Sequence, residues 1–191
     1  MLTARDLSYG LYGAWRLTLL DRNAGRYFDT SIDGFWKSFY AAAIAAPGVI
    51  IVTALIVAQV GLPDHVGYPS FILAKAAQYV ISWVLFPLVM ATVSDLLQRG
   101  EQYIGFVVAF NWWQVVEMAV SLPLFLLIIA SGASAQEPNT VVNLLLLAVA
   151  FYYWFIARTM LRISGWSAVA VVAINLTLSG GLEIATKAVL Y

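Results

Sequence analysis

Four polar side chains recur at helical spacing inside residues 104–130, a stretch that is otherwise almost wholly apolar. They are Asn111, Gln114, Glu117 and Ser121. At about 100° per residue these positions fall within an arc of about 120°, so they form one polar stripe on an apolar helix. A carboxyl group near the middle of such a helix can bind an ion or a proton, or it can hydrogen-bond to a neighbouring helix.

A second set of polar side chains is divided between two other apolar stretches. Lys75 and Gln78 lie in one of them, and Asn175, Glu183 and Lys187 lie in the last. Counting along the helices places Glu183 at about the depth of Lys75, which predicts an ion pair between two helices. Lys187 is the alternative partner, because it follows Glu183 by one helical turn on the same helix.

Helix packing is the favoured role for both sets of polar side chains. Hydrogen bonds between apolar helices contribute roughly 0.6–2 kcal/mol each and commonly fix how the helices meet. A path for protons or solutes and a surface buried against a partner protein are the two alternatives. Repeated carboxyl groups along several stretches are missing, which argues against a proton wire.

The composition is that of an integral membrane protein. Hydrophobic residues make up 62% of the 191 positions, and charged residues make up 10%, where a soluble domain has about 25% charged residues. The net charge is zero, so the chain as a whole does not attract nucleic acid. Cysteine is absent, which excludes disulfides and thiolate metal sites.

The predicted fold class is all-α, a polytopic membrane helix bundle with five transmembrane helices and an N-terminal interfacial amphipathic helix. Each apolar stretch reaches the roughly 20 residues that are needed to cross the hydrocarbon core. Short segments rich in Gly, Pro or charge separate the stretches. We expect spans at approximately 38–60, 71–94, 104–130, 141–161 and 166–190, with 38–191 as the transmembrane domain.

Residues 1–37 form a cytoplasmic segment in this interpretation. Charges interrupt it throughout, so it is not a cleavable signal, and the first apolar stretch is a permanent anchor. Within 7–20, apolar side chains recur at helical spacing, which predicts a helix on the membrane surface or, equally, a short helix packed under the bundle. Asp29, Thr30 or Ser31 is expected to cap the helix that enters the membrane.

The distribution of basic residues predicts the orientation. Arginine and lysine are absent from the first and third connections and concentrated before the first span and around the second and fourth connections. This pattern is typical of a cytoplasmic N-terminus and a C-terminus on the opposite side, in a membrane that we take to be a bacterial inner membrane. The cations on the N-terminal side are Arg5, Arg16, Arg22, Arg26, Lys37, Arg99, Arg158 and Arg162.

Small residues indicate where helices approach one another closely. Ala41 and Ala45 form a small-xxx-small pair in the first span, as do the residues that follow each of them. Gly180 and Gly181 are expected to admit a neighbouring helix against the last span. The aromatic run FYYWFIAR at 151–158 is predicted to anchor the fourth span at the interface, with a groove for a lipid tail or a quinone-like ring as the alternative.

Catalytic and metal-binding motifs are absent. His65 is the only histidine and is expected in a solvated connection. The chain has no H-E-x-x-H, G-x-S-x-G or P-loop pattern. We therefore expect no metal, no cofactor and no enzymatic activity.

The order of the spans resembles that of the Yip1-like family of five-span membrane proteins. The resemblance lies in the proline-containing second span with its short charged turn, at 85–114, and in the late helix pair with a tight basic turn, at 154–176. The segment GLYGAW at 10–15 lacks the Asp and Pro of the Asp-Leu-Tyr-Gly-Pro motif found in eukaryotic members. The resemblance implies a non-enzymatic, protein-binding membrane scaffold.

The predicted function is therefore that of an interaction or scaffold component, acting through helix packing and partner binding. Its expected partners are membrane lipids and either other membrane proteins or a second copy of the chain, without nucleic acid. One alternative is a small transporter or channel that uses Glu117 as an ion or proton site. Another is an accessory subunit of a larger membrane complex.

Overall fold

A computed structural model describes residues 2–131 and 140–190, and every regular element in these ranges is helical. The elements are α1 (Ala4–Thr18), the short 3-10 helix η1 (Ala24–Tyr27), α2 (Ile32–Ser38), α3 (Tyr40–Val60), α4 (Tyr68–Leu96), α5 (Gly100–Ala130), α6 (Thr140–Met160) and α7 (Gly165–Leu190).

Five helical segments are long and apolar enough to cross a membrane, as predicted. The first begins at Ile32 rather than at residue 38, because α2 runs almost directly into α3. Ser31 starts it by accepting a hydrogen bond from the backbone N–H of Gly34 at 3.0 Å, and it is one of the three predicted caps. The boundary predicted at residue 38 therefore falls inside this segment. The predicted connection 131–140 lies largely outside the described residues.

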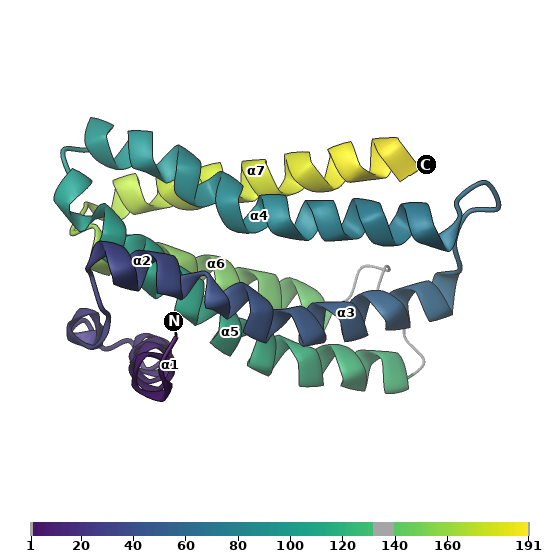
Figure 1. The fold of residues 1–191 in the computed structure, drawn as a ribbon, viewed down its shortest axis with the longest axis horizontal. Coiled ribbons are helices and arrows are strands. Elements are labelled where there is room, and N and C mark those ends of the chain that lie inside the picture. The colour runs from purple at the N-terminus through teal and green to yellow at the C-terminus, as the bar shows by residue number, and fades with distance from the viewer. Residues whose placement is uncertain (1, 132–139, 191) are drawn as a thin grey trace.

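Helix α5 is the centre of the bundle. It packs against α1, α2, α3, α4 and α6, whereas α7 packs against α4 and α6. In Figure 1, α4 and α7 run side by side in an upper tier, and α3, α5 and α6 form a lower tier. We call the end that carries α1, η1 and the turns at 97–99 and 161–164 the basic end. The opposite end, with the 61–67 connection, is the far end.

The core lies in the half of the bundle next to the basic end. Every residue of α5 from 105 to 113 is buried, because five other helices surround this half of α5. Phe86 of α4 packs against Phe106 and Phe110, with ring centroids 6.0 and 4.7 Å apart. A helix that is apolar on all sides is stable only when it is enclosed in this way or surrounded by lipid.

Helix α1 lies across the basic end and is seen end-on in Figure 1. Thr3 and Asp6 form a capping box at its start. Hydrogen bonds from the Thr3 backbone and from Lys37 lower the pKa of Asp6 to about 2. The ion pair between Lys37 and Asp6, at 3.0 Å, joins α1 to α2.

Glycines bring α1 against the core. A Cβ atom added at Gly10 would overlap the indole ring of Trp112, and one added at Gly13 would lie 2.8 Å from the Phe28 ring. The opposite face of α1 leaves Tyr9, Tyr12 and Trp15 about half exposed. The helix therefore packs under the bundle and also presents an aromatic face outward, so it has features of both predicted arrangements.

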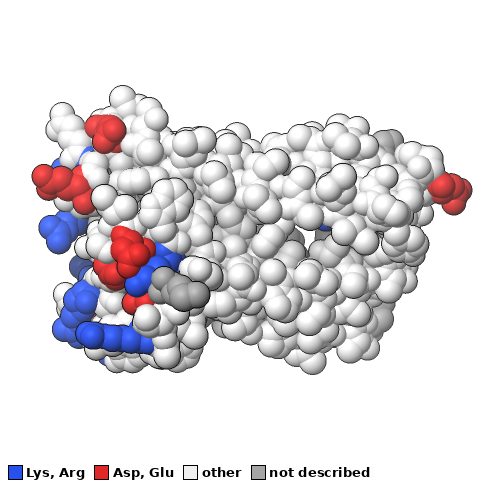
Figure 2. All heavy atoms as spheres, in the orientation of Figure 1, with Lys and Arg blue, Asp and Glu red and all other residues white. Residues whose placement is uncertain are grey.

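The outer surface of the five long helices is apolar. Leu73, Leu147 and Ile184 are 72%, 67% and 70% exposed, a pattern that water does not favour on a folded protein. Figure 2 shows most of the charged side chains on this face gathered at the basic end, with an acidic group at the opposite end and a long, almost uncharged flank between them. Lipid is the solvent that such a surface matches.

The small-residue predictions had different outcomes. Ala41, Ala45 and Gly48 are buried, and α3 packs against α5. The prediction of a close neighbour at Gly180 and Gly181 is wrong within this chain, because a Cβ atom added at either position would meet nothing within 4 Å. These glycines lie on an open face of α7, since its packed face carries Val171, Asn175 and Thr186 instead.

Candidate functional site

Asn111 lies at the centre of the half of the bundle next to the basic end, which we call the compact half, and is completely buried. Its Nδ2 donates a hydrogen bond to Ser38 Oγ of α2 at 2.9 Å, and Ser38 Oγ donates to the Phe35 carbonyl oxygen at 2.7 Å. Asn111 Oδ1 has no hydrogen-bond partner among the described residues. This contact fixes the register of α2 on α5.

Glu117 lies further along α5 and meets a different helix. Tyr153 of α6 donates a hydrogen bond from its hydroxyl to Glu117 Oε2 at 2.9 Å. Gln114 is half-buried, and Ser121 is buried. The predicted polar stripe therefore does not converge on one site, because Asn111 faces α2 and Glu117 faces α6.

The second set of polar residues does form a cluster, in the far half of the bundle. Lys75 Nζ donates to Gln78 Oε1 at 2.9 Å and lies 3.4 Å from Glu183 Oε2. Gln78 Nε2 donates to the same carboxylate oxygen at 2.6 Å. Lys187 Nζ lies 3.5 Å from the other oxygen, Glu183 Oε1. Both ion pairs that the sequence left open are present together. We call these four residues the polar cluster.

The polar cluster is accessible and carries a net positive charge. The side chains of Lys75, Glu183 and Lys187 are 30%, 40% and 62% exposed. Two ammonium groups share one carboxylate, so one positive charge is left uncompensated within the cluster. Asn175 is not a member, because it is buried about two turns earlier on α7.

The polar cluster opens into a cleft between α3 and α4. One cavity of about 640 Å³ has mainly apolar walls, among them Ile50 and Ile72, and a second of about 810 Å³ includes Glu183 and Lys187. The two cavities share Thr53, Val57, Phe71 and Lys75, and together we call them the cleft. Figure 2 shows the surface hollowed between the two tiers.

The cleft exists because its two walls follow different neighbours. Helix α3 packs along α5, whereas α4 packs along α7 as well as α5. The Tyr79 hydroxyl donates to the Ala42 carbonyl oxygen at 2.6 Å and holds α3 and α4 together near the compact half. Beyond that bond, the cleft separates the two helices.

The cleft offers the chemistry of recognition. Its polar groups are hydrogen-bond donors and acceptors at the edge of a large apolar surface, an arrangement that fixes the orientation of an apolar ligand. Within residues 2–131 and 140–190 there is no group of three or more His, Asp or Glu side chains that could hold a metal ion. Sequence reasoning missed the apolar walls, because Val57 or Phe71 has the same residue type as the lipid-facing positions around it.

Comparisons with protein-family models, with curated proteins and with solved structures give no match. The resemblance to the Yip1-like family therefore stays a prediction.

Proposed function

We propose that this chain is a non-enzymatic integral membrane protein that binds a transmembrane helix of a partner protein in the cleft. Its five long helices cross the bilayer with the basic end in the cytosol and the C-terminus on the opposite side, in a bacterial inner membrane. The apolar outer surface and the charges at one end support this orientation.

The cleft is the observation that carries the proposal. Within a bilayer an apolar surface gains little by avoiding lipid, so helices associate through close packing and hydrogen bonds. Because the cleft separates α3 from α4, each of these two helices has an open side against which another helix can pack. A partner helix in the cleft would pack against Val57 and Phe71 and bring its own polar groups to Lys75.

The polar cluster indicates which partner helix fits. Its uncompensated positive charge favours a partner with a carboxyl or amide group at the same depth. Lys187 is the most exposed cation of the cluster and the group best placed to meet it. If the partner belongs to a larger membrane complex, the chain is an accessory subunit of that complex.

Site-specific photo-crosslinking in cells tests the proposal. A photo-reactive residue at Ile72, in the wall of the cleft, is expected to capture one defined membrane protein. The same residue at Leu147 of α6 is the matched control, because it is equally exposed but lies outside the cleft. The Lys75→Met substitution should lower the Ile72 yield several-fold and leave the Leu147 background unchanged.

Three outcomes would overturn the proposed function. Equal capture from Ile72 and Leu147 would show that the cleft has no selectivity. Adducts with lipid alone would make the cleft a lipid-facing surface. A dimer of the chain as the only product would mean self-association in place of a different partner.

A further inference from the structure

Two hollows adjoin at the basic end, far from the cleft. One of about 540 Å³ lies between η1, the start of α5 and the end of α6. The other, of about 430 Å³, lies along the last two turns of α6. Arg22, Thr159 and Arg162 line both hollows, so the two meet along these side chains.

Arginines that lack a carboxylate partner surround these hollows. Arg22 and Arg26 come from the segment around η1, and Arg158 and Arg162 come from the end of α6. All four are exposed, and none forms an ion pair with a carboxylate in the described part of the chain. Among the described residues, Glu101 is the one carboxylate that lines either hollow, so the four arginines leave the site with a net positive charge.

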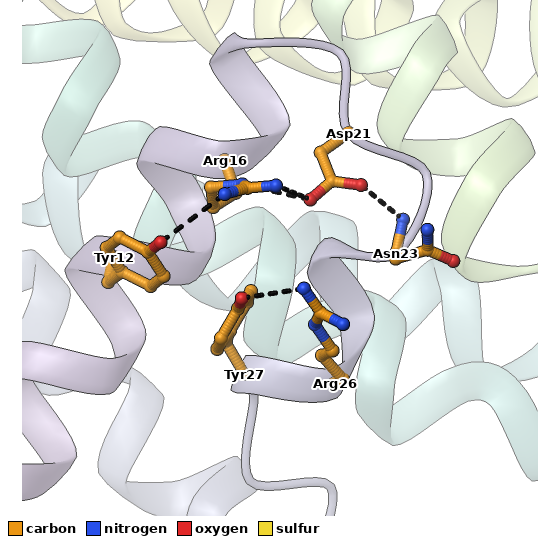
Figure 3. Close-up of polar contacts among 6 residues, drawn as sticks. All are labelled: Tyr12, Arg16, Asp21, Asn23, Arg26 and Tyr27. Atoms are coloured by element: carbon orange, nitrogen blue, oxygen red, sulfur yellow. Dashed lines mark hydrogen bonds and ion pairs between the residues drawn. The ribbon is translucent and has the colours of Figure 1, made fainter.

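Arg16 provides the contrast within the same segment. Figure 3 shows its guanidinium group against Asp21, with a nitrogen–oxygen distance of 2.6 Å, while Arg26 donates to the Tyr27 hydroxyl at 2.8 Å and lies over the Tyr27 ring. The Asp21 carboxylate holds the pKa of Arg16 above its ordinary value. The charge of Arg16 is therefore balanced by an ion pair, whereas Arg26 acts on Asp21 only at longer range, which leaves its guanidinium group available to an external anion.

The second hollow adds an aromatic wall to the positive charge. Phe151, Trp154 and Phe155 line it beside Leu20 and Ile163. The Arg158 guanidinium group lies over the Trp154 ring at 5.1 Å from the centroid, which holds its charge at the border between aromatic surface and open space. The two hollows together therefore have arginines at one end and aromatic side chains at the other. An amphipathic anion has the matching arrangement of a charged headgroup and an apolar chain.

The backbone at Arg162 is the third observation. Arg162 has φ of 54°, in the left-handed region that favours glycine, directly after α6. An arginine at this position is conformationally costly, and it sends a long cationic side chain into the wall shared by both hollows. Glycine would satisfy the turn without supplying the charge.

We propose that the two hollows form a binding site for an anionic phospholipid. Arg22, Arg26 and Arg162 hold the phosphate of the headgroup through bidentate hydrogen bonds, and an acyl chain lies along Phe151 and Trp154. The site needs the proposed insertion of the five helices, which sets the basic end at the level of the cytosolic headgroups. It does not need a partner in the cleft.

The first test measures lipid affinity with variants that keep the fold. The purified full chain in a mild non-ionic detergent is titrated with dioleoyl phosphatidylglycerol or with dioleoyl phosphatidylcholine, and bound lipid is counted by native mass spectrometry. Wild type should prefer phosphatidylglycerol.

Arg22→Gln and Arg162→Gly should each raise the apparent Kd for phosphatidylglycerol about tenfold, the usual effect of losing one charge-assisted contact. Arg162→Gly should also keep or raise the thermal midpoint, because glycine relieves the backbone.

A matched control separates the site from general attraction to anionic lipid. Arg5→Gln removes the same charge from an exposed position of α1 that lines neither hollow, so it should leave the Kd unchanged. Equal weakening by Arg5→Gln and Arg22→Gln, or no weakening by either, overturns the site.

A second arm identifies the source of the phosphate. Inorganic phosphate or glycerol 3-phosphate at the same concentration should neither compete with phosphatidylglycerol nor raise the thermal midpoint. Full competition by either would mean a site for a soluble anion and would overturn the lipid assignment. Resistance to an alkaline carbonate wash reports insertion separately, so an inserted chain without lipid preference counts against this site alone.

Discussion

The two halves of the bundle are built from the same kinds of helix but are packed differently. In the half next to the basic end, α1 and α2 add to the long helices, and α5 is enclosed on all sides from 105 to 113. In the far half, α3 and α4 separate, and the cleft with its polar cluster lies between them. One half is a core, and the other is open at the cleft.

This difference between the two halves shows what determines where a core forms around a helix in an apolar chain. The half of α5 beyond residue 115 is the more apolar by sequence, yet the core forms around the other half, so hydrophobicity does not decide where the core forms. Close approach decides it: Gly10 admits the indole of Trp112, and Gly13 admits the ring of Phe28. In the far half, Gly181 has open space where a neighbour would be.

The largest expected effect comes from adding one methyl group at Gly10. The Gly10→Ala substitution should lower the free energy of unfolding by about 2–3 kcal/mol, because the buried Trp112 ring cannot yield without disturbing the core. The matched change in the open half, Gly181→Ala, should be neutral or stabilising by up to about 1 kcal/mol, because alanine favours the helix. Thermal unfolding in detergent compares the two variants. A similar loss at both positions would refute the contrast between the halves.

The sequence predicted the long helices closely because length and apolarity determine them. The predicted span 104–130 and the observed α5 (Gly100–Ala130) differ by one turn, and the predicted 166–190 differs from the observed α7 (Gly165–Leu190) by one residue. The start at Ile32 was not predicted, because the charges of Asp33 and Lys37 led us to assign this part of the chain to the cytoplasmic segment. In the structure these two side chains pair at 2.7 Å on one face of the helix, so they do not interrupt it.

The second prediction concerns Glu117, at the border between the halves. Glu117→Gln keeps an oxygen that can accept from Tyr153 and should change the free energy of unfolding by less than about 0.5 kcal/mol. Glu117→Leu leaves the Tyr153 hydroxyl without its partner and should cost about 1–2 kcal/mol. Thermal unfolding measures both variants, and proton uptake into liposomes is recorded in parallel. Loss of uptake in Glu117→Gln at unchanged stability would favour a transporter over a packing role.

The candidate site was predictable in part. The pairing of Lys75 with Glu183 follows from their depths in two helices, because a charged side chain in an apolar segment has few possible partners. The sequence did not predict that Asn111 and Glu117 contact different helices. Their positions on one stripe of α5 do not indicate which helix packs on either side of that stripe. The cleft itself depends on which helices α3 and α4 pack along, and that choice has no local signature.

The smallest expected effect is a pH dependence confined to the compact half. The pKa of Asp6, about 2, lies below its ordinary value of 3.8, so its ionised form stabilises the folded state. The stabilisation is complete above about pH 4 and is lost as the pH falls toward 2, because the protonated carboxyl group no longer holds Lys37.

Hydrogen exchange of the α1 amides should therefore show greater protection in wild type than in Asp6→Asn at pH 5, with the difference closing near pH 2. A hydrogen bond from the Asn23 backbone also lowers the pKa of Asp21, but Asp21 is present in both proteins and its effect cancels in the comparison. Equal protection of wild type and variant at pH 5 would mean that the Asp6–Lys37 pair does not help to hold α1 on the core.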